Sequence, residues 1–213
     1  MSLRDDLSRL VGRRFARFVT VVVTRVPWLW PVFRRLVGRQ FHSMAPRWEQ
    51  IVSPGHLQSY EAALASLESP ARALDLGTGT GLGAFALARR FPEAEVVGAD
   101  LAEGMIEEAR RKTPVELEGR VRFEVADASR LPYPDGRFEL VTLANMIPFF
   151  DELARVTAPG GAVLLSFSGG AGTPIYVPPE RIRAELGARG FVEFADFAAG
   201  IGTAIVARKG EGA

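Results

Sequence analysis

The sequence predicts an α/β fold: a mostly parallel sheet of seven strands with helices on both faces, preceded by a helical extension. Three observations lead to this prediction. From residue 71 onward, short apolar and β-branched runs alternate with stretches of helical period, as in chains that connect parallel strands through helices. A glycine-rich turn follows the first of these runs. The first 60 residues lack this alternation and differ in charge, so we divide the chain into an extension over residues 1–60 and a main domain over residues 61–213.

The composition excludes several classes of site. The chain has 213 residues, 47% of them hydrophobic, which suits one globular domain with a small extension. It contains no cysteine, so disulfides, thiolate metal sites and cysteine nucleophiles are excluded. Its two histidines, His42 and His56, are too few to build a histidine metal centre, and we expect no metal site.

The extension is strongly basic. Residues 1–41 hold nine arginines against Asp5 and Asp6, a net charge of +7, so the other residues sum to −6 within the overall +1. Such asymmetry indicates an anionic partner, either nucleic acid or a phospholipid surface. The alternative is that arginine is the default cation of this chain, because Lys112 and Lys209 are its only lysines.

The same segment predicts an amphipathic helix over residues 3–26, after which Pro27 and Pro31 interrupt an aromatic stretch. The helix is too charged and its apolar stretch too short to span a bilayer, and no signal-peptide cleavage site follows it. We expect a cytoplasmic protein in which residues 1–35 either pack on the main domain or lie peripherally in a membrane interface, with nucleic acid disfavoured as a partner. The apolar positions at helical spacing are Leu3, Leu7, Leu10, Val11, Phe15, Phe18 and Val22.

The main domain divides into alternating elements. Pro159-Gly160-Gly161 is expected to turn the chain into the fifth strand. The expected strands cover residues 71–76, 94–99, 121–125, 138–143, 162–167, 191–197 and 203–207. The expected helices cover residues 80–91, 103–112, 151–157 and 179–188.

Polar residues lie at the carboxyl ends of four successive strands of this predicted sheet. They are Asp75, Asp100, Asp127 and Asn145. Because the carboxyl ends of parallel strands meet at one edge, these residues are expected to form one rim, and ligands of such sheets bind at that edge.

The turn after the first strand has glycine at positions 77, 79 and 81. Glycine adopts positive φ without strain and lets the backbone lie against a ligand. The helix that follows offers N–H groups to polar ligand atoms. A nucleotide-type cofactor is therefore expected. Residues 79–84 fit the dinucleotide pattern G-x-G-x-x-A, with Asp100 placed as a ribose-binding acid, which would suit an NAD(P)-dependent oxidoreductase.

A competing pattern starts at the end of the first strand. The run Asp75-Leu76-Gly77-Thr78-Gly79-Thr80-Gly81 resembles the first motif of the class I S-adenosylmethionine-dependent methyltransferases. Residues 98–105, 127–141 and 152–161 are similar to the second motif, the third motif and the run before the fifth strand of that family. A dehydrogenase has no need of the last two, so the methyltransferase interpretation is favoured. It implies a Rossmann-like three-layer sandwich with an antiparallel last strand, and S-adenosyl-L-methionine as the cofactor.

The resemblance also implies which residues bind the cofactor. The glycine loop would abut the methionine part, Asp100 would hold both ribose hydroxyls, and Leu101 and Met105 would flank the adenine. Asp127 would accept a hydrogen bond from the adenine amino group, and the backbone of Ala128 would donate one. The full set is Asp75, Gly77, Thr78, Gly79, Gly81, Asp100, Leu101, Met105, Asp127, Ala128 and Asn145, the last as a contact to the methionine end or a turn former.

Residues 41–49 resemble the entry segment of quinone-biosynthesis-type methyltransferases, which folds over the cofactor as a lid and helps to form the acceptor pocket. His42 stands where that segment usually has aspartate, and Trp48 where it has tyrosine. No large insertion follows the fourth or fifth strand, so Phe149, Phe150 and the extension are expected to form the acceptor chamber. Their apolar character indicates a small hydrophobic acceptor, lipid-like or quinone-like.

The implied reaction is methyl transfer by in-line displacement, which depends mainly on positioning. No catalytic residue is assigned, and His42 and His56 are the histidines available as a base. Residues 145–149 lack the Asn/Asp-Pro-Pro-aromatic motif of amino-group methyltransferases, so amide methylation of DNA or protein is disfavoured. A catalytically silent module that binds the cofactor is the alternative function.

Overall fold

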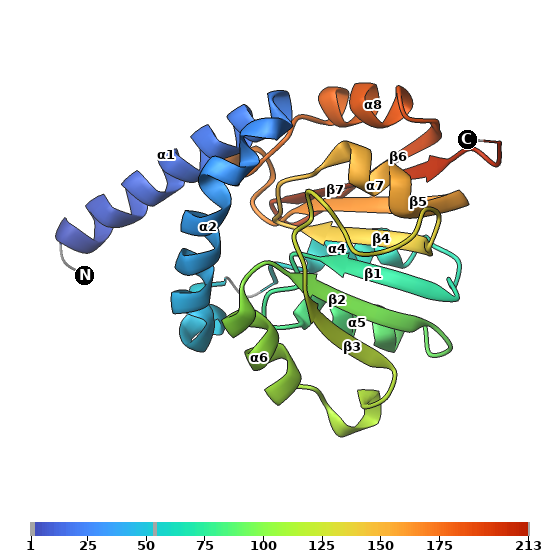
Figure 1. The fold of residues 1–213 in the computed structure, drawn as a ribbon, viewed down its shortest axis with the longest axis horizontal. Coiled ribbons are helices and arrows are strands. Elements are labelled where there is room, and N and C mark those ends of the chain that lie inside the picture. The colour runs from blue at the N-terminus through green and yellow to red at the C-terminus, as the bar shows by residue number, and fades with distance from the viewer. Residues whose placement is uncertain (1–2, 53–54, 213) are drawn as a thin grey trace.

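A seven-stranded sheet forms the centre of the molecule (Figure 1). The structure, a computed structural model, describes residues 3–52 and 55–212. Along the sheet the strands lie in the order β3-β2-β1-β4-β5-β7-β6. Their bounds are β1 Arg72–Leu76, β2 Glu95–Asp100, β3 Val121–Val125, β4 Phe138–Ala144, β5 Thr157–Phe167, β6 Phe191–Ala199 and β7 Gly202–Lys209.

The strand directions confirm the predicted sheet. Strands β1 to β5 pair in parallel, whereas β7 runs antiparallel to both of its neighbours, β5 and β6. From β1 the chain winds through β2 to β3 in one direction, and then from β4 to β5 in the other. The winding therefore reverses between β1 and β4, which is where a sheet of this type leaves a crevice at the carboxyl ends of its strands.

Helices cover both faces of the sheet, which makes a three-layer sandwich. One apolar core lies between the sheet and helices α4, α5 and α6, around Tyr60 and Ile106. The other lies between the sheet and helices α1, α7 and α8, around Val19, Leu153 and Ile182. The helices, with η for short 3-10 turns, are α1 Leu3–Arg25, η1 Pro27–Leu29, α2 Trp30–Met44, η2 Ala45–Arg47, α3 Trp48–Ile51, α4 Gln58–Leu64, α5 Leu82–Arg90, α6 Glu103–Arg111, η3 Val115–Leu117, α7 Phe150–Val156, η4 Gly170–Gly172 and α8 Pro179–Gly187.

The fifth strand begins earlier than predicted. Pro159-Gly160-Gly161, expected as a turn before the strand, lies inside β5. Along β4 the pairing advances from Phe138 to Leu140, while along β5 it advances from Thr157 to Ala162. The three extra residues of β5 interrupt its pairing with β4, and the first glycine of the run has the positive φ of 71° that favours glycine there. The predicted change of chain direction is therefore present, but it lies inside the strand.

The extension forms two helices, α1 and α2, that meet at η1 (Figure 1). Helix α1 continues through the β-branched run at residues 19–23, because Val19 and Val23 are buried against the main domain. Pro31, expected to interrupt the chain, lies in the first turn of α2, where the missing proline N–H costs no hydrogen bond. The side chains of residues 1–11, which carry the first part of the predicted apolar stripe, lie outside the described part.

Arginine side chains fasten α1 to the main domain. Arg13 and Arg17 donate hydrogen bonds to backbone carbonyls of η4, at 2.8 and 3.0 Å. Arg181 of α8 donates to the carbonyl oxygen of Thr24 at 2.7 Å. Part of the basic extension therefore packs on its own domain. Within the described residues, no helix combines the length and the apolar character needed to cross a membrane.

Candidate functional site

A cavity of about 230 Å³ lies at the carboxyl ends of β1, β2 and β4. This is the position where the winding of the sheet reverses. Figure 1 shows α2 running across this end of the sheet. The cavity is therefore bounded by strand ends on one side and by the extension on the other, which contributes Phe15, Val19, Trp30, Val37, Phe41 and Trp48 among others.

The glycine loop between β1 and α5 has the backbone conformation that its sequence predicts. Its three glycines have φ values of 66°, 54° and 91°. The N–H groups of Gly77 and Thr78 donate to the carbonyl oxygen of Ala99, at 2.8 and 3.1 Å. The N–H of Gly79 donates to Oδ2 of Asp100 at 3.0 Å. These three donors fasten the loop to the end of β2, so they are already used within the protein.

Asp75 ends β1 and holds the start of α5 beside this loop. Its carboxylate accepts hydrogen bonds from the Thr142 hydroxyl at 2.9 Å and from the backbone N–H of Ala84. A Cβ at position 83 would lie 2.7 Å from Asp75 Oδ2, so only Gly83 allows the contact. Asp75 is 2% exposed. Burial raises the pKa of Asp75 to about 6, although the hydrogen bonds to its carboxylate partly offset this effect.

Asp100 ends β2, and its carboxylate retains hydrogen-bonding capacity. Oδ2 accepts the Gly79 N–H, and Oδ1 accepts the Ala102 N–H at 2.9 Å. Burial raises the pKa of Asp100, while these backbone donors lower it. Each carboxylate oxygen can accept a second hydrogen bond. The side chain lines the cavity and can therefore accept from two neighbouring hydroxyls of a ligand.

Other features of the cavity wall also suit a polar ligand. The hydroxyl of Thr80 is buried and makes no hydrogen bond to any described residue, although Thr80 lines the cavity. A buried polar atom without a partner costs about 1–3 kcal/mol, which a ligand hydrogen bond would relieve. A Cβ at Gly79 would lie 3.3 Å from Trp48 Nε1, so the loop is tightly covered. These residues fit a nucleoside cofactor with a polar chain.

Most of the residues predicted to bind the cofactor come together here. Asp75, Gly77, Thr78, Gly79, Asp100, Leu101, Met105, Ala128 and Asn145 all line the cavity. Gly81 and Asp127 do not. Gly81 ends the loop and faces the core, because a Cβ there would come within 2.9 Å of the rings of Phe85 and Phe123. Within residues 3–52 and 55–212, no group of three or more histidine or acidic side chains is placed to hold a metal ion.

Asp127 contacts the extension. Its Oδ1 accepts hydrogen bonds from Trp30 Nε1 at 2.8 Å and from the Ser129 backbone N–H at 2.9 Å, and its Oδ2 pairs with Arg34 at 3.2 Å. Burial raises the pKa of Asp127, but the donors from Ser129, Trp30 and Arg34 outweigh burial and lower it. The carboxylate thus fixes α2 against the loop after β3. Its predicted contact with an adenine amino group stays a prediction.

The segment 41–49 covers the side of the cavity that Ala102 and Met105 line. Phe41 and Trp48 pack edge to face, with ring centroids 5.6 Å apart, over a small apolar cluster that includes Met105. Glu49 pairs with Lys112 at 2.7 Å and so attaches α3 to the end of α6.

His42 has a structural contact. Its Nδ1 accepts the backbone N–H of Gly104 at 3.0 Å, in the first turn of α6. The first N–H groups of a helix have no partner within the helix, so His42 supplies the acceptor that a capping side chain would give. His42 does not line the cavity, whereas His56 does.

The loop after β4 combines a turn residue with an aromatic wall. Asn145 has a φ of 54°, and its Oδ1 accepts from the N–H of Ser168 at 2.9 Å, so it is a turn former that also borders the cavity. Phe149 lines the cavity, as expected. Phe150 does not: its ring packs beneath the guanidinium of Arg189, 5.9 Å from the ring centroid.

Several residues of the cavity wall were not predicted individually. Phe41 belongs to the segment 41–49 that was expected to help form the acceptor pocket, and Val37, four positions earlier, shares its face of α2. Met146 lies against Gly77, where an added Cβ would come within 2.9 Å of its side chain. Ile175, from the loop before α8, has no sequence signal of its own.

Comparison with known proteins agrees with this geometry. Residues 73–161 match a family model described as a methyltransferase domain. The chain is 34% identical to a demethylmenaquinone methyltransferase of Deinococcus radiodurans, over 73% of this chain and 84% of that protein. It is 39% identical to a malonyl-[acyl-carrier protein] O-methyltransferase of Halorhodospira halophila, over 64% of this chain and 49% of that protein, about half its length.

The fold is shared with solved structures as well. A structure described as a SAM-dependent methyltransferase from Aquifex aeolicus superposes with a TM-score of 0.61 at 17% identity, covering 78% of this chain and 98% of that one. At that identity the likeness establishes the fold, while the relationship to the Deinococcus protein establishes the family. The chain belongs to the class I S-adenosylmethionine-dependent methyltransferases and uses S-adenosylmethionine as its cofactor.

Proposed function

We propose that this methyltransferase acts on a small apolar acceptor with the chemistry of a quinone or quinol. The composition of the cavity wall away from the glycine loop carries the proposal. Aromatic and aliphatic side chains gather there, among them Phe15, Val19, Trp30 and Phe149. In the described part of the chain, no lysine or arginine lines the cavity. A wall of this kind suits a flat, uncharged ring system.

The names of the relatives indicate two kinds of acceptor, one uncharged and one with a carboxylate. The absence of lysine and arginine along the described cavity wall helps to decide between them. The Deinococcus relative is named for a demethylated menaquinone, and the Halorhodospira relative for a malonyl group on a carrier protein. A malonyl acceptor presents a carboxylate to the methyl donor. Burying a carboxylate without a cationic partner costs several kcal/mol, so the wall favours the uncharged acceptor.

The bound cofactor would supply a methyl group already activated by its sulfonium. We assign Asp100 to the ribose hydroxyls, because its two carboxylate oxygens each have room for one more donor. Leu101 and Met105 would pack on the adenine, and Asn145 would border the methionine end. On this assignment the acceptor occupies the part of the cavity beside Trp30 and Phe149.

The lid and the base complete the proposal. Residues 41–49 would act as a lid that excludes water, which is supported by the position of Trp48 over Gly79 and by the ion pair between Glu49 and Lys112. His56 lines the cavity and is the base we propose. It would accept the proton that an acceptor hydroxyl loses when the methyl group is transferred.

The test is label transfer from methyl-labelled cofactor to two soluble acceptors, a short-chain demethylated naphthoquinol and a malonyl thioester. The proposal predicts a labelled quinol and an unlabelled thioester. Phe15→Ser opens the wall of the cavity, whereas Phe18→Ser changes the same residue type on the exposed side of the same helix. Phe15→Ser should raise the KM for the quinol roughly tenfold, given about 1.5–3 kcal/mol for burying an apolar side chain. Phe18→Ser should leave the KM unchanged.

Two results would contradict this proposal. Label on the thioester alone would assign a carboxylate acceptor despite the apolar wall. Cofactor binding without transfer to either compound, or to any component of a cell extract, would favour the silent binding module.

A further inference from the structure

We propose that the outer face of α1 and α2 docks on the surface of an anionic phospholipid bilayer. We call this surface the docking face. The docking proposal rests on residues outside the cavity and so does not depend on the acceptor proposed above. Its residues are Arg14, Phe18, Val21 and Arg25 of α1, Trp28 of η1, and Val32, Arg35, Leu36 and Arg39 of α2.

The apolar members of the docking face are unusually exposed. The exposed fraction is 76% for Trp28, 70% for Val32, 57% for Phe18, 54% for Leu36 and 43% for Val21. These five are half of the large hydrophobic residues that are exposed in the described part of the chain. Single exposed apolar residues are ordinary on a protein surface, whereas a cluster of them marks an interaction site.

On each helix the docking face lies on a different side from the residues that pack on the main domain. Positions 14, 18, 21 and 25 follow the three- and four-residue spacing of one side of α1, and positions 32, 35, 36 and 39 do so on α2. The core-facing sides are occupied by other residues, Val19 and Val23 on α1 and Val37 on α2. Each helix is therefore apolar on two sides, and only one of them is covered by the main domain.

The charge of the segment determines what can cover the other side. Residues 7–48 contain nine arginines and no aspartate or glutamate. Arg13, Arg17 and Arg34 bind the main domain through hydrogen bonds and an ion pair.

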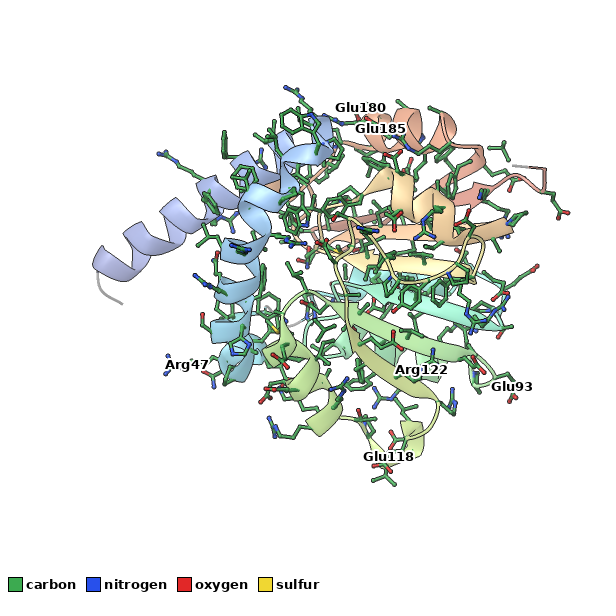
Figure 2. All side chains as sticks on the ribbon, in the orientation of Figure 1. Arg47, Glu93, Glu118, Arg122, Glu180 and Glu185 are labelled. Atoms are coloured by element: carbon green, nitrogen blue, oxygen red, sulfur yellow. The ribbon has the colours of Figure 1, made fainter. Side chains whose placement is uncertain are left out.

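The arginines of the docking face itself are not used in this way. Arg14, Arg25, Arg35 and Arg39 are exposed and pair with no described acidic side chain. Figure 2 shows Arg47, at the end of this segment, also pointing away from the sheet. The docking face thus offers guanidinium groups around an apolar centre, which matches an anionic surface with an apolar interior.

An anionic bilayer satisfies both parts of this chemistry. A tryptophan at the tip, such as Trp28, suits the headgroup level of a membrane, and amphipathic helices with arginine on the polar side lie in the interface plane. A second copy of the chain would bring two basic faces together, which their like charges oppose. Nucleic acid would satisfy the arginines but leave Val32 and Leu36 without apolar contacts.

Docking would place the cavity near the lipid. The same two helices line the cavity with Phe15, Val19 and Val37 and carry the docking face on their other sides. If the acceptor is quinone-like, as proposed above, it is dissolved in the bilayer, and docking brings the chamber beside its source. This last step alone rests on the proposed function.

The experiment is vesicle flotation of the full-length protein at about 0.1 M salt, where charges a few ångströms from a surface still act. Vesicles of phosphatidylcholine alone are compared with vesicles containing phosphatidylglycerol. The wild type should float with the anionic vesicles and not with the neutral ones. The variants are Trp28→Ser with Leu36→Ser, and Arg35→Glu with Arg39→Glu, and each pair should weaken anionic binding at least roughly tenfold.

The control variants make the same types of substitution at exposed residues outside the docking face. Val115→Ser replaces an equally exposed apolar residue, and Arg122→Glu reverses an exposed arginine on β3, well apart from α2 in Figure 2. Both should float like the wild type. Cofactor affinity and turnover of a soluble acceptor should be unchanged in all of the variants, because none of the altered residues lines the cavity.

Three outcomes would overturn the docking proposal. The first is equal binding to neutral and anionic vesicles, or binding that the controls reduce as much as the variants do. The second is a dimer in sedimentation that Trp28→Ser dissociates, which would assign the face to a second copy. The third is duplex DNA binding that outcompetes the vesicles. Failure of the acceptor proposal would leave the flotation result intact, so the two proposals fail separately.

Discussion

The buried carboxyl group of Asp75 should make the stability of the fold depend on pH between about 4 and 6. Burial raises the pKa of Asp75 from 3.8 to about 6 in the folded protein. Over that interval the folded state holds a proton that the unfolded state has already released, so the free energy of unfolding falls as the pH rises. The shift corresponds to about 3 kcal/mol, present in full below pH 4 and lost above pH 6.

The assay is urea unfolding followed by tryptophan fluorescence at several pH values between 4 and 8. Subtracting the curve of Asp75→Asn from that of the wild type cancels the other carboxyl groups, and the difference should fall by about 3 kcal/mol across this range. Thr142→Val provides a second check. It removes a hydroxyl that donates to the Asp75 carboxylate, so it should raise the pKa further and move the fall to higher pH. A difference curve that is flat from pH 4 to 8 would show that folding does not shift the pKa of Asp75.

Three further predictions concern the glycine loop, the extension and the base. Gly79→Ala and Gly119→Ala should each lower the free energy of unfolding by about 1–2 kcal/mol, because both glycines have positive φ. Only Gly79→Ala should weaken cofactor binding, since open space surrounds Gly119. Equal cofactor affinities of the two variants would contradict this prediction. Trp30→Phe keeps an aromatic ring but removes the hydrogen-bond donor to Asp127. Amide hydrogen exchange in α2 should therefore accelerate by the equivalent of about 1.5–3 kcal/mol. Unchanged exchange rates would show that this hydrogen bond does not stabilise α2. His56→Ala should lower kcat about 10²–10⁴-fold with cofactor affinity unchanged, and an unaltered kcat would exclude His56 as the base.

The sheet and its ligand-binding edge were predictable because their signals are local. A β-branched run followed by a polar residue marks a strand end, and glycines at alternate positions after Asp75 mark a tight turn. The strand order then places Asp75, Asp100 and Asn145 at one edge without further information. The spacing of these residues fitted two cofactors, a dinucleotide and S-adenosylmethionine. The family resemblance favoured the second and implied a role for each residue.

The remaining features depend on contacts between distant segments. Asp127 accepts a hydrogen bond from Trp30, 97 positions away in the sequence, a contact that no local pattern reveals, while its contact with the adenine stays a prediction. His42 was weighed as a base, whereas the structure uses it at the start of α6. Helix α4 was missed because its seven residues are too few for a clear helical period, and it is held in place by the burial of Tyr60.

The same limit applies to the extension. The arginines were read as one basic group, but the structure divides them between carbonyls of the main domain and solvent. Packing on the main domain is therefore shown for part of the extension, while membrane contact by its outer face stays a proposal. Arg13 and Arg17 pack on the protein, and the face that carries Arg14 and Phe18 does not.

Isothermal titration calorimetry tests the cofactor assignment most directly. We expect heat with S-adenosylmethionine and with S-adenosylhomocysteine, and none with NADH. Asp100→Ala should weaken both bound forms by about 1.5–3 kcal/mol for each charged hydrogen bond to the ribose, while Asp135→Ala, at a side chain that is 83% exposed, should leave them unchanged. Heat with NADH in place of S-adenosylmethionine, or full affinity in Asp100→Ala, would show that the strand ends of this sheet do not hold the adenosyl group of the methyl donor.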